Sequence, residues 1–81
     1  MGLYTSRGGK FMYHFRTRIQ NRTTECLVVH VEPWGDQIPL LPDAACRLEF
    51  ESPKQGEAEI HIEAGNVMVY GWEGCIARYD S

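Results

Sequence analysis

Residues 26–35 read CLVVHVEPWG, and this stretch decides the fold. Apolar side chains occupy every second position from Leu27 to Val31, which is the period of a β-strand, and the β-branched residues favour a strand over a helix. Pro33 has no N–H to donate to a sheet, so the strand ends there, and Gly35 permits the backbone angles of a turn. The stretch therefore predicts an apolar β-strand that ends in a tight turn carrying a tryptophan.

The same alternation recurs along the chain in both directions. It predicts strands over residues 11–20, 26–32, 46–51, 57–64, 67–72 and 75–79, with a short edge strand at 38–40 between two prolines. Gly65-Asn66 is a two-residue hairpin loop, and Ser52–Gly56 is a longer turn. About six to seven short strands with turns roughly every 8–12 residues predict an all-β fold, a small antiparallel β-sandwich or open barrel.

The 81 residues make one domain with a small core. Residues 1–10 (MGLYTSRGGK) have no periodicity, so we expect a flexible N-terminal arm followed by a single all-β domain over residues 11–81. The apolar side chains of the strands form the predicted core: Phe15, Ile19, Leu27, Val29, Val31, Leu48, Phe50, Ile60, Ile62, Val67, Val69 and Ile76.

Charge is distributed unevenly along the chain. The net charge is −3, but residues 1–22 carry five basic residues and no acid, whereas residues 23–81 carry three basic residues and all eleven acids. One interpretation is a basic strand that lies beside acidic strands and is stabilised by them. The other is a basic arm for nucleic acid or an acidic partner.

Cys26, Cys46 and Cys75 are odd in number and widely spaced, without a C-x-x-C motif. This pattern disfavours a disulfide framework and structural zinc, and it favours a reducing compartment. The sequence shows no signal-peptide core and no apolar run near 18 residues, so we expect a soluble, cytoplasmic protein. It also lacks a Gly-rich phosphate loop and a G-x-S-x-G elbow, so we expect no cofactor, and binding rather than catalysis.

Two aromatic corners are the candidate binding residues. Trp34 follows the central strand, and Trp72 ends the segment Tyr70-Gly71-Trp72. As core plugs, the two indoles would close the ends of a thin sandwich, with each N–H bonded to a loop carbonyl. As a binding surface, they would join Tyr70 and Tyr79 in an exposed aromatic patch that a protein partner or a second copy covers.

Two His-x-Glu pairs, His30 with Glu32 and His61 with Glu63, are the candidate metal ligands. Positions i and i+2 of a strand share a face, so each pair points one way. If the two strands were adjacent, two imidazoles and two carboxylates would converge into a site for zinc, iron or manganese, or for acid–base chemistry. Otherwise both pairs lie on solvated outer faces.

Arg16 and Arg18 are the candidate nucleic-acid contacts. They could touch phosphates while Tyr13 and Phe15 stack on bases, as on sheets that bind single strands. However, the arginines and aromatics alternate along one strand and therefore point to opposite faces. The acidic remainder of the chain would also repel phosphate.

The chain from Phe15 to Trp72 resembles a group of small bacterial proteins. They share an aromatic residue before N-x-[ST], an apolar strand, E-P-W-G and then L-x-P-G. The matching residues here are Phe15, Asn21-Arg22-Thr23, Leu27–Val31, Glu32-Pro33-Trp34-Gly35 and Leu40-Leu41-Pro42. Asp43 stands where those proteins have the glycine, and Asp tolerates turns well. The resemblance implies a compact all-β module and carries over no activity.

We therefore expect a non-catalytic binding module that acts through protein contacts near Trp34 and Trp72, with a partner protein or a second copy as its target. A small inhibitor or immunity-type protein whose acidic surface faces a basic partner is a specific form of this hypothesis. The alternatives are a metal-binding protein or metal-dependent enzyme and a single-strand nucleic-acid binder.

Overall fold

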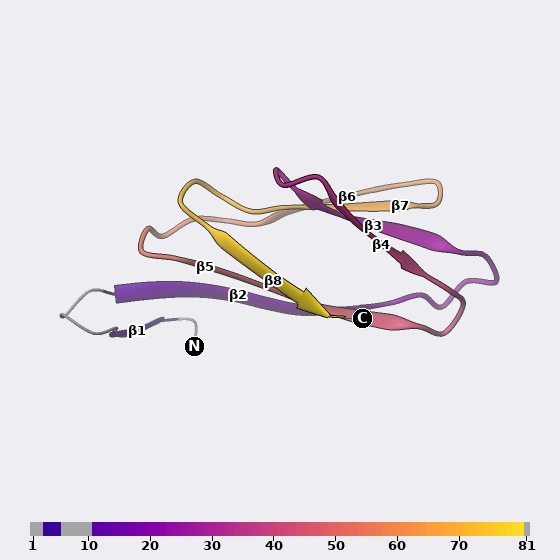
Figure 1. The fold of residues 1–81 in the computed structure, drawn as a ribbon, viewed down its shortest axis with the longest axis horizontal. Helices are drawn as coiled ribbons and strands as arrows, with labels where there is room; N and C mark the ends of the chain where they lie inside the picture. Colours follow the sequence, from indigo (N-terminus) through magenta and orange to yellow (C-terminus); the bar gives the residue numbers. More distant parts are fainter. Residues whose placement is uncertain (1–2, 6–10, 81) are drawn as a thin grey trace.

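The alternating segments form two stacked β-sheets (Figure 1). The computed structural model describes residues 3–5 and 11–80, and within these residues there is no helix. Sheet A has the strand order β1 (Leu3–Thr5), β2 (Phe11–Gln20), β5 (Ala45–Ser52) and β8 (Ile76–Asp80). Sheet B has the order β4 (Asp36–Leu40), β3 (Leu27–Glu32), β7 (Asn66–Tyr70) and β6 (Glu59–Glu63).

The all-β prediction is confirmed, and each predicted strand has a counterpart. Neighbouring strands pair antiparallel with one exception: β3 and β7 run parallel in the middle of sheet B, with Val29 opposite Val67. Of the predicted flexible arm, only Leu3–Thr5 is described, and its backbone pairs with the start of β2. The rest of that arm lies outside the described residues.

The contacts between the two sheets show which strands of sheet A lie over which strands of sheet B. On one side, β8 lies over β4: the Tyr79 phenol is near enough to the Asp36 carboxylate for Asp36 to raise its pKa, and both strands lie near the viewer in Figure 1. On the other side, Phe15 of β2 lines a hollow together with Ala58, which lies just before β6. We call these the β4/β8 side and the β2/β6 side of the sandwich.

The core lies between the middle strands of the sheets. Its buried members are Val29, Val31, Ile38, Leu40, Cys46, Leu48, Phe50, Val67 and Val69. Phe50 is completely buried and is the centre of an aromatic cluster, since its ring stacks on Phe15 at a centroid distance of 6.0 Å and on Trp34 at 5.7 Å. Trp72 meets the same ring edge-on at 6.4 Å. Aromatic pairs of this geometry add stability beyond the area that they bury.

Three predicted core residues lie at the surface instead. Ile60 is 46% exposed and Ile62 is 76% exposed, although both pair with buried valines of β7 and therefore share the inner face of sheet B. They belong to the edge strand β6, which is exposed along its whole length. Ile76 is 50% exposed because it lies opposite Glu51 in sheet A, so its side chain points to the outer face.

A buried asparagine holds the end of the sandwich at which β2 and β4 end and β3 and β5 begin. Asn21 is fully buried, and its Nδ2 donates to the carbonyls of Glu25 (2.7 Å) and Leu40 (2.8 Å). Its Oδ1 accepts from the backbone N–H of Thr23 at 2.9 Å and from the Thr23 hydroxyl at 2.6 Å. Its own backbone bonds to Asp43 and Ala44.

Replacing this amide removes one side chain and leaves several buried groups without partners. We expect Asn21→Ala to lower the free energy of unfolding by about 3 kcal/mol, because unpaired buried carbonyls and N–H groups each keep their desolvation cost. Urea denaturation followed by tryptophan fluorescence measures the change. Thr24→Ala, at an exposed neighbouring position, is the matched control. Equal stability of both variants would contradict the role given to Asn21.

Asp43 occupies the left-handed region with φ of 69°, and among the described non-glycine residues it alone has a positive φ. This backbone conformation disfavours side chains other than Gly, Asn and Asp. We expect Asp43→Val to destabilise the fold by about 1–2 kcal/mol. Asp43→Gly should change stability by less than about 1 kcal/mol, because relief of strain offsets the added freedom of the unfolded chain. The same urea titration checks both values, and an equal loss for Val and Gly would refute the conformational explanation.

Candidate binding surface

Trp34 lies in the turn between β3 and β4, on the β4/β8 side. The Glu32–Pro33 peptide bond is cis, and Gly35 has φ of 80°. The Gly35 N–H donates to the Val31 carbonyl at 2.9 Å, which closes the turn, and the indole lies beside Phe50. One ring face packs on the core, while 41% of the residue remains exposed. Gly71 allows this packing, since a Cβ there would lie 3.2 Å from Cη2 of Trp34. Phe50 and Gly71 therefore cover part of Trp34, and the rest of the side chain is open to solvent.

Trp72 is held more completely. Its indole N–H donates to the Lys54 carbonyl at 2.7 Å, and its backbone N–H lies 3.3 Å from Sγ of Cys75. The loop at Gly56 passes so close that a Cβ there would overlap with the indole ring. Half-buried and bonded in this way, Trp72 has the geometry expected of a core plug.

The two tyrosines lie on different surfaces. Tyr70 is on the outer face of sheet B, where its ring centroid is 5.0 Å from that of His61. Tyr79 is on the β4/β8 side and is 44% exposed. Its hydrogen bond to the Asp36 carboxylate raises the pKa of the Tyr79 phenol, because the bond favours the neutral form. Trp34 precedes Asp36 by two residues in the chain, and Tyr79 interacts with Asp36 from β8, so we call these three residues the Trp34–Tyr79 surface.

The two His-x-Glu pairs share the outer face of sheet B but are separated by a strand. His30 and His61 both lie opposite Met68 of β7, so β3 and β6 are two strand spacings, about 10 Å, apart. His30 Nε2 donates to Asn66 Oδ1 at 2.8 Å, and His61 Nε2 lies 4.0 Å from Glu59 Oε1. Within the described chain, no three His, Cys, Asp or Glu side chains are grouped so that they could hold a metal ion.

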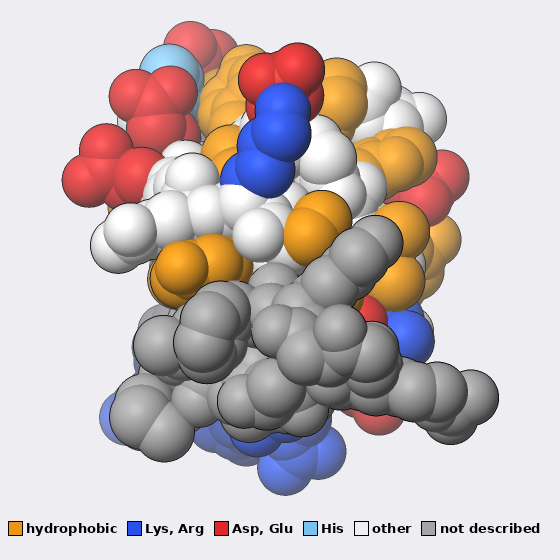
Figure 2. Space-filling view, turned by 90° about the vertical axis from the view of Figure 1, so that its left-hand side faces the viewer, with side chains coloured by type: hydrophobic (Ala, Val, Ile, Leu, Met, Phe, Trp, Pro, Cys, Tyr) orange, Lys and Arg blue, Asp and Glu red, His pale blue; other side chains and the backbone are white. Residues whose placement is uncertain are grey.

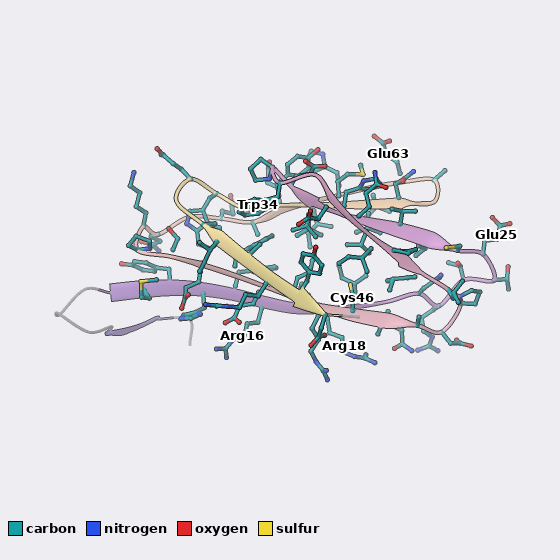
Figure 3. The ribbon with its side chains drawn as sticks, viewed as in Figure 1. Arg16, Arg18, Glu25, Trp34, Cys46 and Glu63 are labelled. Atoms are coloured by element: carbon teal, nitrogen blue, oxygen red, sulfur yellow. The ribbon has the colours of Figure 1, made fainter. Side chains whose placement is uncertain are left out.

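Arg16 and Arg18 point away from the core on the outer face of sheet A (Figure 3). Arg16 Nε donates to Glu49 Oε2 at 2.9 Å, and this bond, together with His14, holds the pKa of Glu49 below its ordinary value. Arg18 donates to Gln20 at 3.2 Å. Phe15, the aromatic proposed to stack on bases, instead stacks on Phe50 inside the sandwich. The arginine face therefore offers cations without that stacking ring.

A groove of about 430 Å³ crosses this face and is lined by side chains of both charges. Its charged residues are Arg16, Arg18, Arg47, Arg78, Glu49 and Asp80. Arg78 lies 3.4 Å from Glu51 and 3.9 Å from Glu49, so ion pairs already engage part of the positive charge. The basic strand thus lies beside acidic side chains, in the way that cross-strand stabilisation requires.

All three cysteines have free thiols, and two of them are embedded in the fold. Burial raises the pKa of Cys46, and the Asp80 charge adds to this effect. Burial also raises the pKa of Cys75, although the Trp72 backbone N–H opposes the shift. A raised pKa makes the reactive thiolate scarcer, so these two thiols behave as small apolar side chains.

Asp36 is the residue of this surface that the sequence pattern does not reveal. It follows the turn glycine and reads as loop, whereas the structure places it at the start of β4. Its significance depends on β8 crossing over β4, and no local signal reports that contact.

Comparisons with protein-family models, curated proteins and solved structures find no match to this chain. In the portion of the chain that the structure describes, no helix is long and apolar enough to cross a membrane.

The hydrogen bond between Asp36 and Tyr79 gives a direct test of this geometry. In Asp36→Asn the pKa of Tyr79 should fall toward its ordinary value near 10.0. Because the folded-state pKa is raised, the stabilisation from this bond is present at neutral pH and is lost as pH rises through the folded pKa. NMR titration of tyrosine ring signals resolves Tyr79 from the other tyrosines. An unchanged titration curve for Tyr79 would exclude the bond.

Proposed function

We propose that this protein is a non-catalytic binding module that contacts a basic partner protein through the Trp34–Tyr79 surface. One observation carries the proposal: two large aromatic side chains remain 41% and 44% exposed, Trp34 in the turn that leads to Asp36 and Tyr79 beside the Asp36 carboxylate. Exposed aromatics of this size are costly in water and are the residues most enriched at the centres of protein interfaces. Of the four aromatic candidates, Trp34 and Tyr79 are the ones classed as exposed.

The chemistry of the surface favours a cationic side chain in the partner. An Arg or Lys of the partner would pair with the Asp36 carboxylate and pack against an exposed aromatic ring. Part of this geometry is already held in the free chain, because Trp34 stacks on Phe50. A preorganised surface loses little side-chain freedom on binding.

The charge of the chain supports the same class of partner. Residues 23–81 carry a net charge of −8 and contribute both Trp34 and Tyr79. A field of this sign accelerates encounter with a basic protein and weakens as salt is added. An inhibitor or immunity-type protein that covers a basic surface of its target is the specific form of this function. The raised pKa values of Cys46 and Cys75 also favour binding over thiol catalysis.

Affinity capture from cell extract with the immobilised wild-type chain tests the proposal. We expect Trp34→Ala and Tyr79→Ala each to weaken capture of the same protein by about 30-fold, the effect of losing an interface anchor. Tyr70→Ala, an aromatic truncation on the outer face of sheet B, should bind as the wild type does. Added salt should weaken the wild-type interaction. Folded Trp34→Ala and Tyr79→Ala chains that capture the same proteins at wild-type levels would rule out this surface.

A further inference from the structure

On the β2/β6 side of the sandwich, the edge strand of sheet B exposes apolar side chains. All five residues of β6 are exposed, including Ile60 and Ile62 on the inner face. Their neighbours across the hairpin, Val69 and Val67, are buried, so β6 extends the apolar inner face of sheet B beyond the packed core. An apolar edge strand is a template for pairing with another strand, and natural proteins normally protect it.

The edge of sheet A on the same side is also available. β1 reaches along β2 only as far as Tyr13, so in the described chain Thr17–Gln20 has a strand neighbour on its β5 side alone. Figure 1 shows both edges on the side of the molecule away from β8 and β4. The sandwich therefore has two pairing-competent edges on one side, one in each sheet.

The side chains on these edges are complementary. On the inner faces of the sheets, β2 carries the apolar Ile19 and β6 carries the apolar Ile60 and Ile62. On the outer faces, β2 carries the basic Arg18, whereas β6 carries the acidic Glu59 and Glu63. Figure 2, which looks down the long axis, shows Asp and Glu side chains gathered at the upper left and Lys and Arg side chains along the bottom. Apolar thus matches apolar, and basic matches acidic.

A two-fold axis parallel to the strands satisfies both matches at once. Glu63 and Arg18 point from opposite faces of one molecule (Figure 3). Rotation by 180° about such an axis exchanges the outer face of sheet A with the outer face of sheet B. It therefore places β6 of a second copy beside β2, in the plane of sheet A. Glu63 of that copy then lies on the same outer face as Arg18. An axis perpendicular to the sheets would instead bring β2 against β2 and β6 against β6, which sets like charges against each other.

We propose that two copies of this chain form a dimer in which β2 of each copy pairs with β6 of the other, so that each sheet continues across the interface. The second copy covers Ile60 and Ile62 with Ile19 and neutralises Glu63 with Arg18. Both contacts occur twice because the interface is symmetric. This dimer uses the side of the sandwich opposite the Trp34–Tyr79 surface and stands independently of it.

Sedimentation equilibrium tests the dimer first with an apolar change. The wild-type chain should be dimeric at about 100 µM. Ile62→Glu should be monomeric there, because a carboxylate cannot be buried in this contact without a partner. The position is 76% exposed, so the fold tolerates the change. Leu41→Glu, which is 67% exposed outside both edges, is the control and should remain dimeric. A monomeric wild type, or a dimeric Ile62→Glu, overturns the proposal.

A charge exchange then tests which strands meet. Arg18→Glu and Glu63→Arg should each raise the dimer Kd about a hundredfold, since each creates two like-charge contacts of roughly tenfold each. Arg18 already lies opposite Arg47 in sheet A, so its reversal improves the pairing within the monomer. An equimolar mixture of the two variants should regain a dimer by forming the heterodimer. A mixture that stays monomeric, or single variants that dimerise as tightly as wild type, excludes the β2–β6 pairing.

Discussion

The buried carboxamide of Asn21 is the constraint on which the rest of the structure depends. The chain leaves sheet A at the end of β2 and must enter sheet B at the start of β3, while β4 ends and β5 begins at the same place. A buried crossing of this kind exposes several backbone groups to a water-free environment, where each needs a partner. The Asn21 side chain provides these partners: its Nδ2 donates two hydrogen bonds to backbone carbonyls, and its Oδ1 accepts two from Thr23. Because these bonds determine where four strands start or stop, they also determine which residues of those strands face each other.

Phe50 plays the corresponding part in the aromatic half of the core. Its ring is contacted by Phe15, Trp34 and Trp72, and of the two indoles Trp72 is half-buried while Trp34 is 41% exposed. Under the proposed function, Trp72 serves stability and Trp34 serves binding, so two similar residues have different roles. If the edge-paired dimer forms, the Trp34–Tyr79 surfaces of the two copies face away from each other. A dimer would then engage two partner sites at once and gain avidity without any new contact.

Local sequence pattern predicts most of this fold, because alternation alone tells which side chains share a face. It places β2, β3, β5 and the β6–β7 hairpin within one or two residues of their observed bounds. Alternation does not report how far the opposite sheet extends, which is why Ile60 and Ile62 appear as core residues in the sequence and as surface residues in the structure. Trp34 and Tyr79 are recognisable as aromatic candidates, but the approach of Tyr79 to Asp36 follows from strand order, as does the separation of His30 from His61 by β7. Long-range pairing of this kind leaves no local signal.

The parallel pairing of β3 with β7 has a kinetic consequence. Parallel neighbours cannot be joined by a tight turn, so the chain between Glu32 and Asn66 must build β4, cross to sheet A as β5 and return before β7 can dock. The β3–β4 and β6–β7 hairpins can form locally. The parallel β3–β7 pairing between them, which we call the seam, joins residues that are far apart in the sequence. Such non-local topology slows folding to the millisecond-to-second range. We expect the amide protons along this seam to exchange slowly with solvent, because β3 and β7 are the middle strands of sheet B and carry buried core residues.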